Sequence, residues 1–257
     1  MKKRNIFNSV VSVGTYKAFI EEIISYAHAK IPSYVCFANV HMVMEAYHDK
    51  SFQKLINEAD LVAPDGRPLS VFLKLSEGIN QDRVCGMDIL PDLLKQAEVS
   101  GKSVYFYGST EEMLKTITQK VRVEFPALKI AGHYSPPFRA LSQKEDEMIT
   151  EKIREAQPDL VFVSLGCPKQ ERWMADHKNK FNACLLGLGQ AFKVYAGVEK
   201  RLPKWMRNLS LEWVYRLYLE PRRLWKRYAY TNSFFLLLAI RYLAIQFFEK
   251  HSRHGVT

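Results

Sequence analysis

The stretch PDLVFVSLGCPKQERWM, residues 158–174, joins an apolar run to a polar helical start through a single glycine. The run from Leu160 to Leu165 is typical of a buried strand. Gly166 ends it, and Pro168 is well placed to begin the helix, because proline suits the first helical positions. A buried strand that leads directly into a helix favours an α/β protein with a parallel sheet.

The same alternation recurs along the chain. Apolar runs typical of buried strands lie at 34–40, 60–64, 103–108, 128–134, 159–166 and 183–189. Helical patterns alternate with them at 41–59, 87–100, 110–125, 142–156 and 169–181. We therefore predict a Rossmann-like α/β fold, with a mostly parallel sheet and helices on both of its faces. Ser109 and Thr110 are predicted to cap one of these helices and Ser142 the next.

Positive charge is concentrated at the C-terminal end of the 257-residue chain. Its formal net charge is +10, and from Lys200 onward twelve Lys and Arg face three Glu, a balance of +9 that leaves +1 for the rest. Three of the four tryptophans lie in the same region. We predict an α/β core at 1–197 and a basic, aromatic helical appendage at 198–257. Such a segment suits a polyanion, either nucleic acid or an anionic membrane surface.

An apolar stretch at 231–248 lies near the end of the appendage and is interrupted by Arg241 and Gln246. A central arginine costs about 2.5–3.5 kcal/mol in a membrane-spanning helix. We therefore expect this helix to lie on the membrane surface, with a span, a core helix or an oligomer contact as alternatives. Nucleic acid is disfavoured as a partner, because the basic part leads directly into this stretch. The oligomeric state is open between a monomer and a homo-oligomer.

The sequence has no pattern typical of a metal or disulfide site. The four cysteines show no CxxC spacing, the seven histidines form no HExxH motif, and no DxD carboxylate pair is present. We expect no metal and no cofactor. The basic start MKKRNIF is followed by no continuous apolar segment, so we expect no export signal and a reducing, cytoplasmic compartment.

Candidate catalytic and ligand-binding residues lie where the predicted strands end. Ligands of open α/β sheets bind beyond the carboxyl ends of the strands, where this chain has Asn39, Asp65, Gly108 and Gly166. Asp65 can act as a general base on a hydroxyl, and the alternative is a carboxylate that closes a turn. Asp88, at the next helix start, is explained by capping or by solvation.

Phosphate groups have two candidate binding elements. Backbone N–H groups at the helix starts after Gly108 and Gly166 suit phosphate oxygens, and so do the arginines of the appendage. Arg216 and Arg223 are seven residues apart and share a helical face if the chain stays helical through Pro221. Anionic lipid is the alternative partner for these arginines.

Three further side chains are candidates for binding the substrate. Gln170 can donate and accept hydrogen bonds, which suits sugar hydroxyls or a uracil edge. Glu171 either contributes to the site or only favours the helix dipole. Phe138, in the SPPF loop, offers a surface on which a base can stack.

Seven stretches together resemble the WecG/TagA/CpsF glycosyltransferases (glycosyltransferase family 26) over almost the whole chain. These stretches are ANVHMVMEAYHDKSFQKLINEADLVAPDGRPL (38–69), GMDILPDLL (86–94), VYFYGST (104–110), PDLVFVSLGCPKQERWM (158–174), GLGQAFKVYAG (187–197), KRLPKWM (200–206) and LEWVYRLYLEPRRLWKRY (211–228). The resemblance implies an inverting, metal-independent transfer of a sugar from a UDP-sugar to a lipid-diphosphate-linked, undecaprenyl-type acceptor. It also implies a place in bacterial surface or exopolysaccharide biosynthesis, peripheral on the inner face of the cytoplasmic membrane.

The resemblance also assigns roles to particular residues. Asp65 matches the proposed base of the family, and Asn39 and Gln170 match residues of its sugar site. The basic appendage is implied to close over the diphosphate and to dock on the membrane. Those implied diphosphate contacts are Arg216 and Arg223, together with Lys226 or Arg227.

Two positions depart from the family pattern. Phe37 stands where many members have Thr, and Lys193 stands where members commonly have an Asp associated with the nucleotide base. These departures favour an alternative, a non-catalytic, membrane-tethered protein that binds nucleotide sugars on the same scaffold. The acceptor, the linkage and the donor sugar stay open, with N-acetylmannosamine, its uronic acid and glucose as candidates for the donor.

Overall fold

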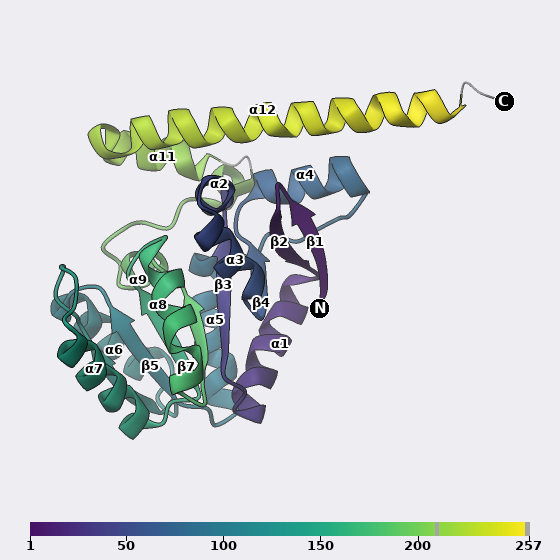
Figure 1. Cartoon of the computed structure of the whole chain (residues 1–257). Coiled ribbons are helices and arrows are strands. Elements are labelled where there is room, and N and C mark those ends of the chain that lie inside the picture. Colours follow the sequence, from purple (N-terminus) through teal and green to yellow (C-terminus); the bar gives the residue numbers. More distant parts are fainter. Residues whose placement is uncertain (209–210, 255–257) are drawn as a thin grey trace.

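The centre of the protein is a six-stranded sheet of parallel strands (Figure 1). The computed structural model describes residues 1–208 and 211–254, apart from the side chains of residues 204, 208, 223 and 250–254. The strand order is β4-β3-β8-β7-β5-β6. The strands are β3 (Ser33–Ala38), β4 (Leu61–Pro64), β5 (Val104–Gly108), β6 (Ile130–Tyr134), β7 (Leu160–Ser164) and β8 (Cys184–Gly187). Each lies within or overlaps one of the six predicted runs, which confirms the predicted fold class.

Helices cover both faces of this sheet and bury a separate apolar core on each. One face carries α2 (Val40–His48), α3 (Lys50–Glu58), α7 (Gln143–Ala156) and α8 (Lys169–His177), with the 3₁₀ turn η1 (Lys178–Lys180) after α8. The other face carries α1 (Tyr16–Ala29), α5 (Gly86–Val99), α6 (Glu111–Glu124) and α9 (Ala191–Tyr195). Because both faces are covered, the central strands are mostly apolar along their length instead of alternating with polar residues.

The N-terminal hairpin is absent from the sequence prediction. It consists of β1 (Lys2–Ile6) and β2 (Ser9–Val13), which pair antiparallel through a turn at Phe7 and Asn8. Both turn residues have positive φ, 50° and 67°, as a tight hairpin turn requires. The hairpin covers the β4 edge, where the Ser12 hydroxyl accepts a hydrogen bond from the Val62 N–H (3.1 Å).

Two local predictions need correction. The predicted helix at 41–59 is two helices, because Asp49 caps the start of α3 by accepting hydrogen bonds from the N–H groups of Ser51 and Phe52. Thr110 is the cap of α6, whereas Ser109 has a left-handed φ of 61° and belongs to the preceding turn. The Ser142 cap is confirmed and forms a capping box with Glu145.

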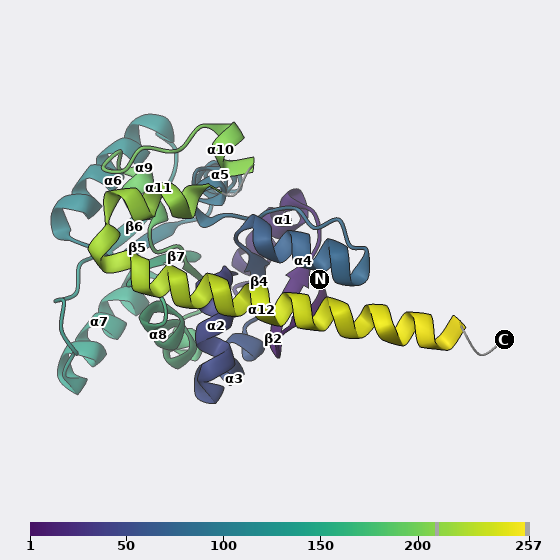
Figure 2. The same ribbon diagram turned by 90° about the horizontal axis from the view of Figure 1, so that it is seen from above.

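The appendage contains α10 (Lys204–Asn208), α11 (Glu212–Leu219) and α12 (Pro221–His254). The chain does not stay helical through Pro221, since Glu220 leaves the helical conformation with φ −132° and ψ 60°. Helices α11 and α12 therefore meet at a corner and fold back on each other (Figure 2). Arg216 and Arg223 consequently belong to two helices, and the condition for a shared helical face is not met.

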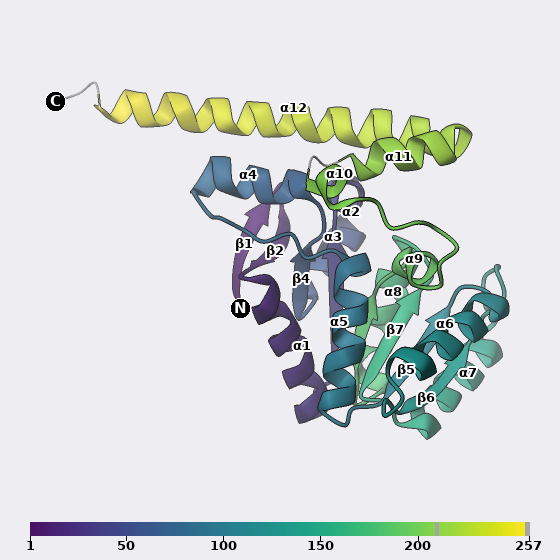
Figure 3. The same cartoon turned by 180° about the vertical axis from the view of Figure 1, so that it is seen from behind.

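Helix α12 lies across the end of the core where the strands of the sheet terminate (Figures 1 and 3). Its buried side chains form one stripe, made of Leu224, Tyr228, Thr231, Phe235 and Ala239. This spacing of three or four residues marks a single helical face. The Phe235 ring lies 5.4 Å from that of Phe7 and 6.2 Å from that of Phe72 on α4 (Arg67–Glu77). Apolar packing thus holds this helix on the core.

We expect Gly108→Ala to destabilise the protein strongly. Gly108 has φ +103°, and a Cβ atom there would lie 2.3 Å from the Ser164 carbonyl oxygen on the neighbouring strand. The backbone strain and the clash together should lower the free energy of unfolding by about 3 kcal/mol or more, as judged by urea denaturation. Gly101→Ala is the control, since its φ is +62° but nothing lies within 4 Å. Equal losses in both variants would contradict the close approach of β5 and β7.

Candidate active site

The chain leaves the adjacent strands β5 and β7 toward opposite faces of the sheet. The helix after β5 packs on one face of the sheet and the helix after β7 on the other. Such a divergence opens a crevice in which α/β proteins bind ligands. The Ser109 N–H donates to the Ser164 carbonyl (2.9 Å), which ties the two strand ends together. The parallel sheet therefore places the candidates Asn39, Asp65, Gly108 and Gly166 along this one edge, because each follows the end of a strand.

Asp65 lies directly after β4, and its backbone N–H donates to the Ala38 carbonyl (2.7 Å) at the end of β3. Burial raises the pKa of its carboxyl group to about 6. A hydrogen bond from the Cys85 thiol and the charge of Arg83 act in the opposite direction, whereas Glu212 and Asp88 raise the pKa further. The group is ionised above pH 6 and is still a stronger base than an exposed aspartate. These are the properties of a general base that works near neutral pH.

Asn39 is the N-cap of α2, and its side-chain oxygen accepts a hydrogen bond from the Met42 N–H (3.1 Å). Two arginines of the appendage lie near the same helix start. The pKa of His41 is lowered to about 4 by burial and then by the charges of Arg227 and Arg216. The buried Nε of Arg227 has no hydrogen-bond partner among the described residues. The structure therefore brings positive charge from the appendage to the beginning of α2, where free N–H groups favour an anion.

The two other basic candidates of the appendage lie on α12. The side chain of Arg223 lies outside the described part of the structure. Lys226 is exposed, with its ammonium group 5.7 Å from the centre of the Trp225 ring. Their roles toward a diphosphate stay predictions.

The Gln170 side chain is buried and bonded within the protein. Its oxygen accepts a hydrogen bond from the Gly166 N–H (3.3 Å), and its nitrogen donates to the Gly187 carbonyl (3.1 Å) and to Glu171 (2.7 Å). It therefore fixes the loop after β7 to the end of β8. Gly166 has φ +82°, which a glycine adopts readily. Contact of Gln170 with a sugar or uracil stays a prediction.

Glu171 is completely buried at the start of α8. Burial raises the pKa of its carboxyl group to about 7, against hydrogen bonds from Gln170 and the Cys167 thiol that lower it. Because the side chain has no exposed surface, it does not present its charge to a ligand in this conformation. Its assignment to substrate binding stays a prediction without support from its position.

Phe138 projects from the loop after β6 with 83% of its side chain exposed. The loop is tied to the end of β5, because the Ser135 hydroxyl donates to the Ser109 carbonyl (2.7 Å). An exposed ring on a loop held at the carboxyl end of β5 suits stacking, which stays a prediction. Of the two departures from the family pattern, Phe37 is buried in the core, whereas Lys193 forms an ion pair with Glu199 (3.4 Å).

A cluster of paired charges beside Asp65 is absent from the sequence prediction. We call it the arginine–carboxylate network; its members are Arg83, Asp88, Arg201, Arg207 and Glu212. Asp88 is bonded to Arg83 (2.6 Å), Arg201 (2.5 Å) and Arg207 (2.8 Å), while Glu212 is bonded to Arg83 (2.6 Å) and Arg201 (2.5 Å). Asp88 is thus neither a helix cap nor simply solvated. The only sequence signal was the presence of charges in segments more than a hundred residues apart.

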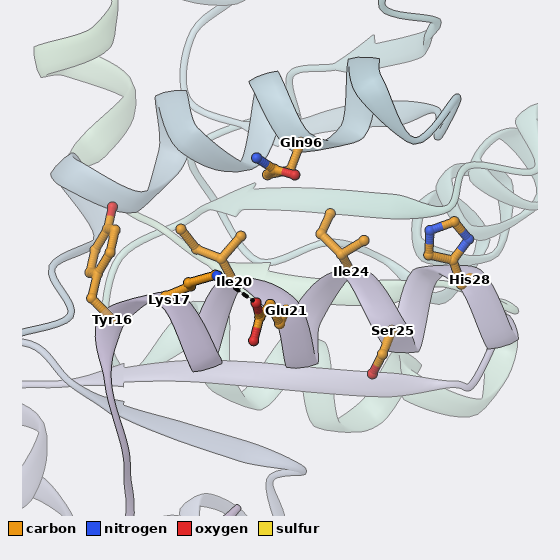
Figure 4. Close-up of a pocket in the computed structure, with 8 residues that line it drawn as sticks. All are labelled: Tyr16, Lys17, Ile20, Glu21, Ile24, Ser25, His28 and Gln96. Carbon is orange, nitrogen blue, oxygen red and sulfur yellow. Dashed lines mark ion pairs between the residues drawn. The ribbon is translucent and has the colours of Figure 1, made fainter.

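Two hollows lie on the surface of the molecule, and neither is lined by Asn39, Asp65, Gly108 or Gly166. A groove of about 350 Å³ lies on the flank between α1 and α5 (Figure 4). It is lined by Tyr16, Lys17, Ile20, Glu21, Ile24, Ser25, His28 and Gln96. A second hollow of about 440 Å³ adjoins the arginine–carboxylate network at Asp88 and Arg201. Over residues 1–208 and 211–254, no group of three or more His, Cys, Asp or Glu side chains is placed to hold a metal ion.

Comparisons with known proteins find similarity to glycosyltransferases of a single family. A model described as "Glycosyl transferase WecG/TagA/CpsF family" matches residues 4–247. The chain is 34% identical to N-acetylglucosaminyldiphosphoundecaprenol N-acetyl-beta-D-mannosaminyltransferase of Bacillus subtilis (strain 168), over 79% of this chain and 77% of the relative. It is 30% identical to the protein of the same name from Staphylococcus aureus (strain NCTC 8325 / PS 47), over 78% and 76% of the two chains.

Proposed function

The chain belongs to the WecG/TagA/CpsF family of glycosyltransferases, and we propose that it transfers a sugar from a UDP-sugar to a polyprenyl-diphosphate-linked sugar in bacterial cell-envelope or exopolysaccharide biosynthesis. The names of its relatives support this acceptor class, since they describe transfer of N-acetylmannosamine to N-acetylglucosaminyldiphosphoundecaprenol. One observation carries the proposal: Asp65 directly follows β4 at the end of the sheet that the appendage crosses, and burial there raises the pKa of its carboxyl group.

The proposed reaction needs one base and a set of positive charges. Asp65 takes the proton of the acceptor hydroxyl, and the hydroxyl oxygen forms a bond to the anomeric carbon of the donor sugar. The bond from that carbon to the diphosphate breaks on the opposite side, and UDP leaves with the electron pair, so that the configuration inverts. Arg216, Arg227 and the N–H groups at the start of α2 stabilise the charge that develops on the diphosphate. The proposal includes no metal ion.

A donor panel tests this proposal directly. The full-length protein is incubated with undecaprenyl-diphosphate-linked N-acetylglucosamine and with UDP-sugars in turn, and release of UDP is measured with and without EDTA. Transfer from at least one donor, unchanged by EDTA, is the expected result. Release of no UDP with any donor would favour the alternative, a non-catalytic protein that binds nucleotide sugars. Loss of activity in EDTA would contradict the metal-free mechanism.

We also propose that α12 docks the protein on the inner face of the cytoplasmic membrane. The segment Leu224–Glu249 is, by length and composition, long and apolar enough to cross a membrane. One stripe of the helix packs on the core, however, which favours a helix that lies flat. Large apolar side chains are exposed on its remaining surface, among them Leu236, Leu237, Ile240, Phe247 and Phe248. An apolar helix face with nearby basic residues suits an anionic lipid surface.

Substitution of the exposed face should abolish this docking. The triple variant Leu236→Ser/Leu237→Ser/Ile240→Ser removes apolar side chains that are each about 60% exposed. We expect its partitioning to anionic vesicles to fall at least about 10³-fold in a flotation assay, because burial of each of the three side chains contributes on the order of 1.5 kcal/mol. Val99→Ser/Val123→Ser is the control, since these exposed valines lie on α5 and α6. Flotation of the triple variant at the wild-type level would refute docking through this face.

A further inference from the structure

The arginine–carboxylate network joins the appendage to the core next to the proposed base. Arg83 and Asp88 belong to the core, whereas Arg201, Arg207 and Glu212 belong to the appendage. Three of the five ion pairs therefore join the appendage to the core: Arg201 and Arg207 each pair with Asp88, and Glu212 pairs with Arg83. All five side chains are about one-fifth to one-quarter exposed, so water screens these pairs less than pairs on an open surface.

The charge balance of the network depends on Asp65. Three arginines face two carboxylates, an excess of one positive charge, which an ionised Asp65 neutralises. The charges of Arg83, Asp88 and Glu212 all act on Asp65, as does the thiol of Cys85 from the start of α5. A proton on Asp65 therefore changes the net charge of the whole group.

Glu212 has a special position among these residues. It is the carboxylate that the appendage contributes to the network, and it reaches the site only when α11 lies on the core. Its two oxygens are divided between Arg83 and Arg201 (2.6 and 2.5 Å), so a single carboxylate links a core arginine to an appendage arginine. Arg83 in turn bonds Asp88 with its other nitrogen (2.6 Å). The Val84 N–H donates to the Pro64 carbonyl (2.9 Å), which places Arg83 next to Asp65 along the chain's contact at the end of β4. Glu212 thus fixes the orientation of a guanidinium close to Asp65.

We infer that Glu212 is a positioning residue: by docking on Arg83 and Arg201 it completes the charge environment in which Asp65 accepts a proton, so that the base is fully effective only while the appendage covers the site. This inference rests on the proposed function of Asp65. It gives the appendage a role in the chemical step in addition to its roles toward diphosphate and membrane.

The direction of the effect follows from the charges. Glu212 is negative and raises the pKa of Asp65, whereas Arg83 lowers it. When the appendage leaves, Arg83 loses one of its two carboxylate partners and its charge acts on Asp65 with less compensation. Asp65 then has a lower pKa and is a weaker base. The loss of Glu212 alone should reproduce this change.

The test is Glu212→Gln in the full-length protein, which keeps the shape of the side chain and removes its charge. Wild-type kcat/KM should fall as pH falls through about 6, because Asp65 becomes protonated. In the variant we expect this decrease of kcat/KM, the acid limb of the pH profile, to move to lower pH. We also expect kcat at pH 7.5 to fall about tenfold, in line with the loss of charge-assisted hydrogen bonds. Glu212→Asp should restore most of both properties.

Tyr230→Phe is the matched control. It removes the contact between the Tyr230 hydroxyl and His48 (3.1 Å), which joins the appendage to α2 without a change of charge beside Asp65. We expect it to leave the acid limb in place. An unmoved acid limb in Glu212→Gln, or an equal shift in Tyr230→Phe, would overturn the inference.

A second readout separates this inference from the proposed function. Carbon NMR of labelled aspartate follows the titration of the Asp65 carboxyl group without any substrate, with Asp65→Asn to identify the signal. A lower Asp65 pKa in Glu212→Gln supports the coupling even in a protein that shows no sugar transfer. An unchanged titration contradicts it, whatever the assays of activity show. Absence of transfer in the wild type contradicts only the proposed function.

Discussion

Asp65→Asn is expected to reduce sugar transfer by about 10²- to 10⁴-fold, the usual contribution of a general base. The amide cannot take the proton of the acceptor hydroxyl, although it has nearly the shape of the carboxylate. Binding of UDP should persist, because the proposed diphosphate contacts are Arg216, Arg227 and the start of α2. The Asp65 backbone bond to Ala38 is also unaffected by the change.

The measurement combines steady-state transfer with UDP titration by calorimetry. Asp176→Asn is the matched control, since Asp176 is an exposed aspartate on α8, a helix that carries no proposed catalytic group. We expect the control to retain wild-type turnover. Near-normal turnover of Asp65→Asn would remove Asp65 from the role of base.

Truncation after Gly197 should have an effect of similar size. It removes Arg216 and Arg227, and Glu212 with them, so the diphosphate loses its positive partners and Asp65 loses part of its surroundings. Loss of a single preorganised charge stabiliser costs about 10²–10³ in rate, and we expect a loss of at least about 10³ with a lipid-linked acceptor. Full activity of the truncated protein would refute a site shared by core and appendage.

A folding control is needed for this truncation. The sheet and both of its helical layers remain, but Phe7 and Phe72 lose the cover that Phe235 provides. We expect circular dichroism to show a folded core with added apolar surface. The full-length variant Arg216→Gln/Arg227→Gln leaves that packing intact, and it should reproduce most of the loss. If it stayed active while the truncation did not, the loss would come from packing and not from charge.

Five of the six strands of the sheet could be predicted because they are buried on both faces and are therefore mostly apolar runs, whereas the partly buried edge strand β6 contains Gly132 and His133. The N-terminal hairpin was missed because its turn, Phe7-Asn8, lacks the glycine that usually marks such turns. The break within 41–59 did leave a local signal, since Asp49 precedes Ser51 as a cap would. The break was missed because the helical hydrophobic pattern continues on both sides of Asp49.

The site could be predicted less completely than the fold. Strand-end residues were found because parallel topology brings all carboxyl ends to one edge. The arginine–carboxylate network was missed because Arg83 and Glu212 are 129 positions apart, and a long-range ion pair leaves no periodicity. Gln170 and Glu171 are predicted from the chemistry of their side chains, and the sequence does not reveal that both are buried or that Gln170 bonds to Gly166 and Gly187.

Helix α12 has a further consequence that follows from its one-sided burial. The aromatic contacts of α12 with Phe7 and Phe72 exist only while the helix packs on the core. If the same segment crossed a bilayer, Phe235 and Tyr242 would lose these contacts with the core. The helix therefore cannot span the membrane and cover the core at the same time. A disulfide that joined α12 to α2 would permit only the arrangement in which α12 covers the core.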